Sequence, residues 1–306
     1  MKILIVGAGG VGGYFGAKLM NAGADITYLE KESRHALIQK QGLTIETPTE
    51  TFTVHPKLVT ANYLEPLYDL IILTPKAFDL EEALNSLSKA TSKGVLLPLL
   101  NGFSHIEKLD NQFGKTRVMG GVAQIMAMTT PTGSVKRYNE MHSLTIGHRS
   151  PEHEALARAF FEICKKADFD HFYSENIEQS LWDKWVFLAS LAALTTFFHS
   201  SIGEIAATCY GEELINRIYK ECCLIAKVCG FDINEVTQNI TLEILTEKNS
   251  FLSASMLRDL NIGQKTEHEH ILNDLIQRGV NGGLSCELLK IAYTHISLLV
   301  SNSVQN

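Results

Sequence analysis

The amino-acid sequence predicts an α/β domain followed by an all-helical domain. Short apolar runs alternate with helical patterns up to about residue 166, and this alternation is typical of a parallel sheet with helices on its faces. After Asp168 strand-like runs nearly vanish and helical patterns follow one another. The length of 306 residues fits two domains of about 150 residues each. We therefore predict an α/β domain over residues 1–170 and a helical domain over residues 171–306.

A glycine-rich turn joins the first predicted strand, residues 2–6, to the first predicted helix, residues 14–20. Gly7, Gly9 and Gly12 lie in this turn with G-x-G-x-x-G spacing. In a dinucleotide-binding turn the first glycine permits the tight bend, the second lets the backbone approach a pyrophosphate, and the third lets the helix pack on the strand. Free N–H groups and the positive end of the helix dipole then face the phosphates. This context predicts a Rossmann-type domain that binds a dinucleotide through the following residues: Gly7, Ala8, Gly9, Gly10, Val11 and Gly12.

The end of the second predicted strand, residues 25–29, gives conflicting indications about the cofactor. Glu30 lies where an acidic residue would bind the free 2′-hydroxyl of NAD. Lys31 follows at once and Arg34 lies one turn later, and cations there suit the 2′-phosphate of NADP. We expect NADP, bound in part by Lys31, and NAD stays open because of Glu30.

Polar side chains follow two further predicted strands. Lys76 comes after the strand over residues 69–73, and Asn101 comes after the strand over residues 94–98. Ligands bind at the carboxyl ends of strands in open α/β sheets, so both residues are candidates for a site. The other expected elements are short strands within residues 43–54 and 134–146, and helices over residues 33–41, 79–90, 152–166, 176–198, 212–229, 233–245, 252–261, 266–277 and 286–300.

Charge and composition argue against several classes of function. The chain has 27 basic and 34 acidic residues, a net charge of −7, whereas a nucleic-acid partner requires a basic face. The longest apolar stretch, residues 185–198, is shorter than the roughly 20 residues of a membrane span, so we expect a buried helix and no membrane partner. None of the six cysteines forms C-x-x-C. This cysteine pattern favours a reducing, cytoplasmic setting without metal or disulfides. His268 and His270 flank Glu269 without a third ligand, so we expect surface histidines there and no metal site.

Motifs in both halves together resemble the ketopantoate reductase (2-dehydropantoate 2-reductase) family. The resemblance covers essentially the whole chain, and the order and spacing of the motifs make it specific. The motifs are G-A-G-G-V-G-G at residues 7–13, Lys76, Asn101-Gly102, the Pro131/Gly133 turn, Trp182-Asp183-Lys184, Ile202-Gly203-Glu204, Ser255-Met256-Leu257-Arg258-Asp259 and Thr266-Glu267.

The resemblance implies NADPH-dependent reduction of ketopantoate to pantoate, a step of pantothenate and coenzyme A biosynthesis. Lys184 matches the family's catalytic lysine, which hydrogen-bonds the substrate carbonyl and protonates the developing alkoxide. Glu267 matches the glutamate near the nicotinamide and the substrate hydroxyl. Ser255 matches the serine that holds the substrate carboxylate, and Lys76 and Asn101 match residues at the cofactor and the reacting centre. A homodimer is compatible with the sequence.

The helical half departs from the family pattern at three positions. Leu188 and Ala192 lie one and two helical turns after Lys184, where members usually carry asparagines, and Ile202 replaces a further asparagine. Without these amides the site should bind a polyoxygenated substrate less well. Two alternatives therefore stay open: a reductase of a less polar 2-keto acid, and a dinucleotide-binding regulator without catalysis. Retention of Lys184 and Glu267 argues against the regulator.

Overall fold

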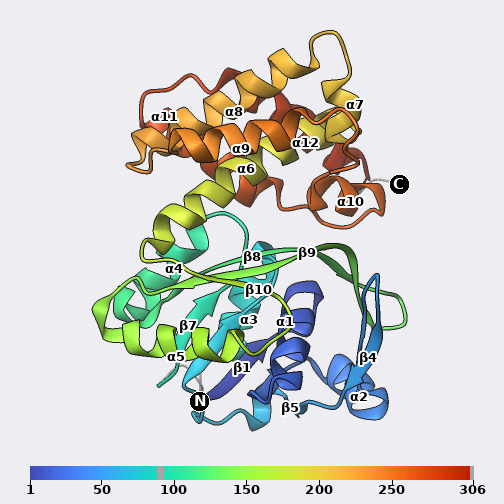
Figure 1. Ribbon diagram of the computed structural model, residues 1–306, viewed down its shortest axis with the longest axis vertical. Coiled ribbons are helices and arrows are strands. Elements are labelled where there is room, and N and C mark those ends of the chain that lie inside the picture. Colours follow the sequence, from blue (N-terminus) through green and yellow to red (C-terminus); the bar gives the residue numbers. More distant parts are fainter. Residues whose placement is uncertain (88–92, 304–306) are drawn as a thin grey trace. The chain divides into compact units, whose positions relative to one another are not determined.

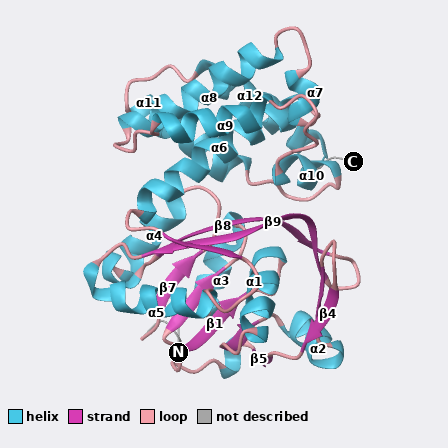
Figure 2. Cartoon of the chain, viewed as in Figure 1, coloured by secondary structure: helices cyan, strands magenta, loops and turns pink. Residues whose placement is uncertain are grey.

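The computed structural model describes residues 1–87 and 93–303, and the chain divides into two compact units (Figure 1). Unit 1 comprises Met1–Leu100 and His105–Ser180. Unit 2 comprises Asn101–Ser104 and Leu181–Asn306. Figure 2 shows all the strands in unit 1, whereas the described part of unit 2 consists of helices and loops. The predicted fold class, a Rossmann-type domain followed by a helical domain, is therefore confirmed.

Unit 1 is built on a five-stranded parallel sheet with the strand order β5-β2-β1-β6-β7. The two strands flanking β1 pair with it in register, so that Val6 lies between Leu29 and Leu73. Because both faces of the sheet are covered, β6 is buried at every position, as its unbroken apolar sequence predicts. The strands are β1 Lys2–Val6, β2 Asp25–Leu29, β5 Lys57–Val59, β6 Leu70–Leu73 and β7 Val95–Pro98.

Helices connect these strands in the alternating order of a doubly wound fold. The predicted helix over residues 79–90 is observed from Leu80, and its last predicted residues lie outside the described chain. The helix α4, Ser104–Phe113, was not predicted. The helices of this region are α1 Gly10–Asn21, α2 Glu32–Gln41, α3 Leu80–Ser86 and α5 Glu154–Cys164, with 3₁₀ turns at Ala61–Tyr63, Ala77–Asp79, Lys115–Arg117 and Pro151–His153.

A second sheet of unit 1 has the order β10-β9-β3-β4, with β8 pairing to β9. The sequence indicated short strands over residues 134–146, but the structure has one long strand whose antiparallel pairing with β8 shifts register between Ile125 and Ala127. This irregularity interrupts the pairing without ending the strand, so one long strand is observed where the sequence indicated short ones. The strands are β3 Leu43–Glu46, β4 Thr51–Val54, β8 Gly120–Thr129, β9 Val135–Gly147 and β10 Asp170–Tyr173.

Unit 2 is helical, and its helices agree with the predicted ones to within a few residues except at two places. The short helix α7, Ile202–Ala206, was not predicted. The predicted helix over residues 266–277 is a π-helical turn, Glu269–Asn273, that continues into α11, Asp274–Asn281. Such turns are rare and are frequently found at functional sites. The other helices are α6 Ile177–Phe198, α7 Ile202–Ala206, α8 Gly211–Val228, α9 Glu235–Thr246, α10 Ser255–Asn261 and α12 Glu287–Ser303.

Within the described chain, α6 is the one helix that is long and apolar enough to cross a membrane by length and composition. The protein itself buries 67% of its most apolar window, as happens with the core helix of a globular protein. Trp182 and Trp185 in this helix are each 1% exposed. The helix therefore forms part of a protein core.

Candidate functional site

The glycine-rich turn between β1 and α1 has the geometry that a dinucleotide site requires. Gly7 has a φ of +94°, which an L-residue rarely adopts. A side chain on Gly12 would collide with the carbonyl oxygen of Gly7 and with Thr74, so this position admits only glycine. A Cβ on Gly9, by contrast, would meet no atom within 4 Å. The space beside Gly9 therefore suits close approach by a phosphate group.

Thr74 and Lys76 lie at the same edge of the parallel sheet as the glycine turn. The Thr74 hydroxyl donates hydrogen bonds to the carbonyl oxygens of Val6 (2.9 Å) and Gly7 (3.0 Å). Lys76 follows two residues later, is partly buried, and begins the 3₁₀ turn after β6. These contacts fix the turn from the neighbouring strand, at the edge where ligands of such sheets bind.

Glu30 is attached directly to the glycine turn. Its Oε1 accepts a hydrogen bond from the backbone N–H of Ala8, and burial raises the pKa of its carboxyl group. Arg34 donates from Nη2 to the carbonyl oxygen of Ala8 over 3.2 Å. The Lys31 ammonium lies 2.7 Å from a carboxylate oxygen of Glu82, and its side chain is 74% exposed. Glu30 is thus held at the turn, while Lys31 is paired on the surface.

Three residues predicted for the site lie together in unit 2. The Lys184 ammonium on α6 donates to Oδ1 of Asn101 over 3.0 Å. The Asn101 amide donates from Nδ2 to Oε2 of Glu267 over 3.3 Å. Glu267 is only 4% exposed. The amide of Asn101 therefore joins a cation and a buried carboxylate that are far apart in sequence.

Burial lowers the pKa of Lys184 to about 8, although the nearby Glu267 carboxylate acts to raise it. Desolvation disfavours the charged form of an amine, and here it outweighs the attraction of the carboxylate. An ammonium with this pKa is mostly protonated at neutral pH and gives up its proton more readily than an ordinary lysine. These are the properties of a general acid.

Ser255 lies apart from this hydrogen-bonded chain of residues, as the first residue of α10. The N–H of the preceding Ala254 donates to Oγ1 of Thr195 over 3.2 Å, and Thr195 is fully buried in α6. The start of α10 is therefore fixed to the same helix that carries Lys184.

The three departures from the family pattern differ in exposure. Ala192 and Ile202 are fully buried, whereas Leu188 is partly exposed. Leu188 lies one turn after Lys184 on α6, so the two side chains share a face of the helix. An apolar side chain is thus the neighbour of the candidate acid.

The prediction that His268 and His270 are surface residues was wrong. Both are partly buried, and His268 Nδ1 lies 2.7 Å from the hydroxyl of Thr266. His270 contacts the segment that carries Asn101, which sequence reasoning missed because the H-E-H pattern was judged only as a metal motif. Trp185 Nε1 also donates to the carbonyl oxygen of Ile271 over 3.0 Å. The π-helical turn is thus tied to α6 beside Lys184.

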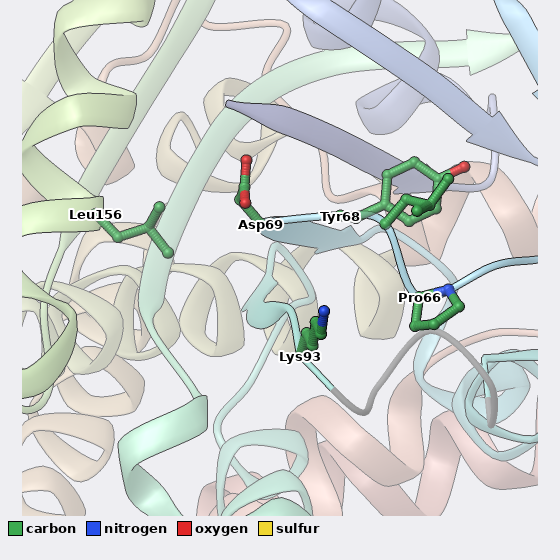
Figure 3. Close-up of a pocket in the computed structure, with 6 residues that line it drawn as sticks. Pro66, Tyr68, Asp69, Lys93 and Leu156 are labelled. Atoms are coloured by element: carbon green, nitrogen blue, oxygen red, sulfur yellow. The ribbon is translucent and has the colours of Figure 1, made fainter.

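Two hollows of the described surface lie in unit 1 and are lined by residues outside the glycine turn. The first has a volume of about 420 Å³ and is lined by Pro66, Leu67, Tyr68, Asp69, Lys93 and Leu156; Figure 3 shows it in close-up. Asp69 precedes β6, so this hollow is at the amino ends of the strands, opposite the edge with the glycine turn. A second hollow of about 230 Å³ surrounds Arg149, which is engaged by Asp110 and Glu178. Among residues 1–87 and 93–303, no three His, Cys, Asp or Glu side chains are grouped as metal ligands.

Comparison with known proteins agrees with this geometry. Residues 3–151 match the family described as ketopantoate reductase PanE/ApbA, and residues 176–299 match its C-terminal domain. The chain belongs to the ketopantoate reductase family. As a member it is a dinucleotide-binding oxidoreductase.

The proteins that resemble this chain carry the names of different activities. The 2-dehydropantoate 2-reductase of Pyrococcus horikoshii is 30% identical, with 90% of each chain covered. The uncharacterized oxidoreductase YkpB of Bacillus subtilis is 29% identical over 97% of this chain and 98% of its own. Among solved structures, D-mandelate dehydrogenase with NADH and anilino(oxo)acetate has a TM-score of 0.88 at 22% identity, with 99% of each chain covered. A dimeric ketopantoate reductase from Staphylococcus aureus has a TM-score of 0.83 at 20% identity, covering 99% of this chain and 100% of that one.

Proposed function

We propose that this protein reduces the carbonyl group of a 2-keto acid, with Lys184 as the general acid. Ketopantoate is the first candidate substrate, which would make the protein a 2-dehydropantoate 2-reductase of pantothenate biosynthesis. The observation that carries the proposal is the hydrogen-bonded series Lys184, Asn101 and Glu267 within unit 2. A relative that is 30% identical carries the name of this activity.

In this proposal, residues of unit 1 bind the cofactor and residues of unit 2 bind and protonate the substrate. The glycine turn of unit 1 would bind the pyrophosphate, with Lys76 at the same edge of the sheet. When bound, the nicotinamide cofactor supplies the hydride. Lys184 would donate a hydrogen bond to the substrate carbonyl and then its proton to the developing alkoxide. Asn101 orients the ammonium, and Glu267 keeps it charged and would accept from a substrate hydroxyl.

For the cofactor, we propose NADH as the preferred reductant, in place of the NADPH expected from the resemblance. Glu30 is held at the glycine turn by Ala8, so its carboxylate would meet the adenosine ribose, accept from a 2′-hydroxyl and repel a 2′-phosphate. Lys31, the residue expected to bind that phosphate, is paired with Glu82 instead. Turnover with NADPH at least equal to that with NADH would refute this preference.

A second candidate function is supported by Leu188. Its apolar side chain lies one helical turn from Lys184, where an amide would have bound a substrate oxygen. A branched apolar or aromatic 2-keto acid would pack against Leu188, so a reductase of such an acid is the alternative to a ketopantoate reductase.

The deciding experiment follows nicotinamide absorbance at 340 nm (about the maximum of the reduced ring) with ketopantoate and a panel of apolar 2-keto acids. Each substrate is tested with NADH and NADPH. A kcat/KM for ketopantoate at least tenfold above the panel supports the first candidate, and equal or better turnover of an apolar acid supports the second. Absence of turnover with every acid, despite cofactor binding, would refute both.

The proposal also covers the roles of the two domains, the cellular location and the oligomeric state. We propose that residues 1–170 and 171–306 are the cofactor-binding and the substrate-binding domain, and that the protein acts in the cytoplasm as a homodimer. A fold neighbour described as dimeric supports the last point. A single species of monomer mass in light scattering would refute it.

A further inference from the structure

His270 lies in the π-helical turn that follows Glu267, and it contacts the segment Asn101–Ser104 at two points. Its Nε2 is 2.6 Å from the carbonyl oxygen of Asn101. Its Nδ1 is 2.9 Å from the hydroxyl oxygen of Ser104. All of these residues belong to unit 2. One imidazole thus bridges the two ends of a four-residue segment.

The chemistry of the contacts fixes the roles of the ring nitrogens. A carbonyl oxygen only accepts, so Nε2 must carry the proton and donate to Asn101. In the neutral ring, Nδ1 then accepts from the Ser104 hydroxyl, which can rotate to donate. The imidazole therefore satisfies a backbone acceptor and a side-chain hydroxyl at the same time.

The backbone of the segment is shaped to receive this ring. Gly102 has a φ of +77°, and a Cβ at this position would come within 2.9 Å of His270 Nε2. Phe103 packs on Trp182 with a ring-centroid distance of 5.5 Å and on Phe231 at 6.0 Å. Gly102 allows the imidazole to approach, and Phe103 fixes the segment in the aromatic core.

The contacts of His270 position the side chain of Asn101. The Asn101 amide reaches Lys184 with its oxygen and Glu267 with its nitrogen. A backbone held by His270 leaves the amide few alternative directions. Glu267 lies three residues before His270, so one short segment of the chain carries both the carboxylate and the ring that aims the amide toward it.

We propose that His270 is a positioning residue of the reductase: through the Asn101 carbonyl it holds the Asn101 amide between Lys184 and Glu267. This inference rests on the proposed function for its kinetic consequences. The structural claim, that His270 holds Asn101 in place and Asn101 binds the Lys184 ammonium, can be tested without a known substrate.

The central test is a double-mutant cycle of His270→Phe and Asn101→Ala. His270→Phe keeps an aromatic ring and removes both hydrogen bonds, and we expect kcat to fall about 10- to 100-fold, as for a misplaced catalytic group. If His270 acts through Asn101, the double variant is no slower than Asn101→Ala alone. His270→Gln keeps an N–H at the same number of bonds from Cα and should recover most of the rate. If the fold-losses in kcat of the two single variants multiply in the double variant, the two residues act independently and the proposal is overturned.

A matched control uses a histidine of the same unit. His295 on α12 packs its ring on Phe197 at 4.8 Å between centroids, so His295→Phe makes the same chemical change away from Asn101. We expect this variant to keep wild-type kcat and pH profile. A loss equal to that of His270→Phe would show that any such change in unit 2 disturbs the enzyme, and it would overturn the assignment.

A second readout does not depend on turnover. The rate at which acetic anhydride modifies Lys184, measured by peptide mass spectrometry across pH, reports the midpoint of its titration. Loss of the Asn101 oxygen removes a hydrogen bond to the ammonium, so the midpoint should move to lower pH in His270→Phe and in Asn101→Ala. An unchanged midpoint in His270→Phe would refute the inference. Failure of the wild type to reduce any 2-keto acid, with these midpoints shifted, would refute the proposed function alone.

Discussion

Replacing Lys184 by methionine should have opposite effects on activity and on stability. Methionine keeps most of the length of the side chain and removes the ammonium. Loss of a general acid lowers kcat by about 10²- to 10⁴-fold. The fold, in contrast, no longer has to bury the ammonium.

The size of the stability gain follows from the pKa of Lys184, which falls from the usual 10.5 to about 8. A difference of roughly 2.5 units corresponds to about 3 kcal/mol, at 1.36 kcal/mol per unit. Because the side chain keeps partial contact with solvent, we expect a gain of about 1–3 kcal/mol for Lys184→Met at pH 7. The unfolded chain binds more protons than the native one between pH 8 and 10.5, so wild-type stability should rise with pH there and approach that of the variant.

Tryptophan fluorescence during urea unfolding measures the free energy of unfolding of unit 2. It reports on this unit because the two tryptophans of the chain, Trp182 and Trp185, are both buried in α6. The free energies of unfolding of wild type and variant are compared at pH 7 and at pH 10. A variant that is less stable at pH 7, or a difference that does not shrink with pH, would refute the assignment of a desolvated ammonium. An inactive and less stable variant would mean that the loss of activity reports damage to the fold.

Three further predictions concern the cofactor and the substrate. Glu30→Ala should lower the ratio of kcat/KM for NADH to that for NADPH by about tenfold or more, as expected for loss of a charged hydrogen bond to the ribose; an unchanged ratio would show that Glu30 does not meet the ribose. Gly12→Ala should abolish cofactor binding measured by nicotinamide fluorescence, since the added methyl group collides with Gly7 and Thr74, and near-normal affinity would contradict the geometry of the turn. Leu188→Asn should raise kcat/KM for ketopantoate relative to an apolar 2-keto acid by about 10-fold; a fall in that ratio would show that Leu188 does not contact the substrate.

The sequence predicted β1, β6 and β7 because they are apolar runs, and it predicted β2 from a mixed run, but it did not predict the edge strand β5. It missed β10, whose Asp-His-Phe-Tyr sequence alternates between exposed and half-buried positions and has no buried residue. Pairing with β9 makes this segment a strand, and pairing is not visible in a short polar sequence. Tertiary context likewise converts the start of the predicted helix 266–277 into a π-helical turn, whose Ile271 carbonyl binds Trp185.

Part of the candidate site could be predicted from the sequence because its residues lie in recognisable motifs. Lys184, Asn101 and Glu267 were predicted, and the structure places them in one series of hydrogen bonds. His270 was not predicted for the candidate site, because the His268-Glu269-His270 pattern was judged only as a metal motif. Its contact with Asn101 joins residues that are 169 positions apart. The position of Lys31 beside Glu82 was also not predictable, since it depends on how α3 packs near the end of β2.

The assignment of Asn101–Ser104 to unit 2 has a consequence for recombining members of the family. The segment lies within the range matched by the N-terminal family model, yet its hydrogen bonds are made with Lys184, Glu267 and His270. A chimaera joined near residue 175 would take this segment from one parent and its binding partners from the other. Crossovers that keep residues 101–104 with the helical parent should therefore yield active hybrids more often than a single junction. In this chain, the sequence range matched by the N-terminal family model therefore differs from the range of the compact structural unit.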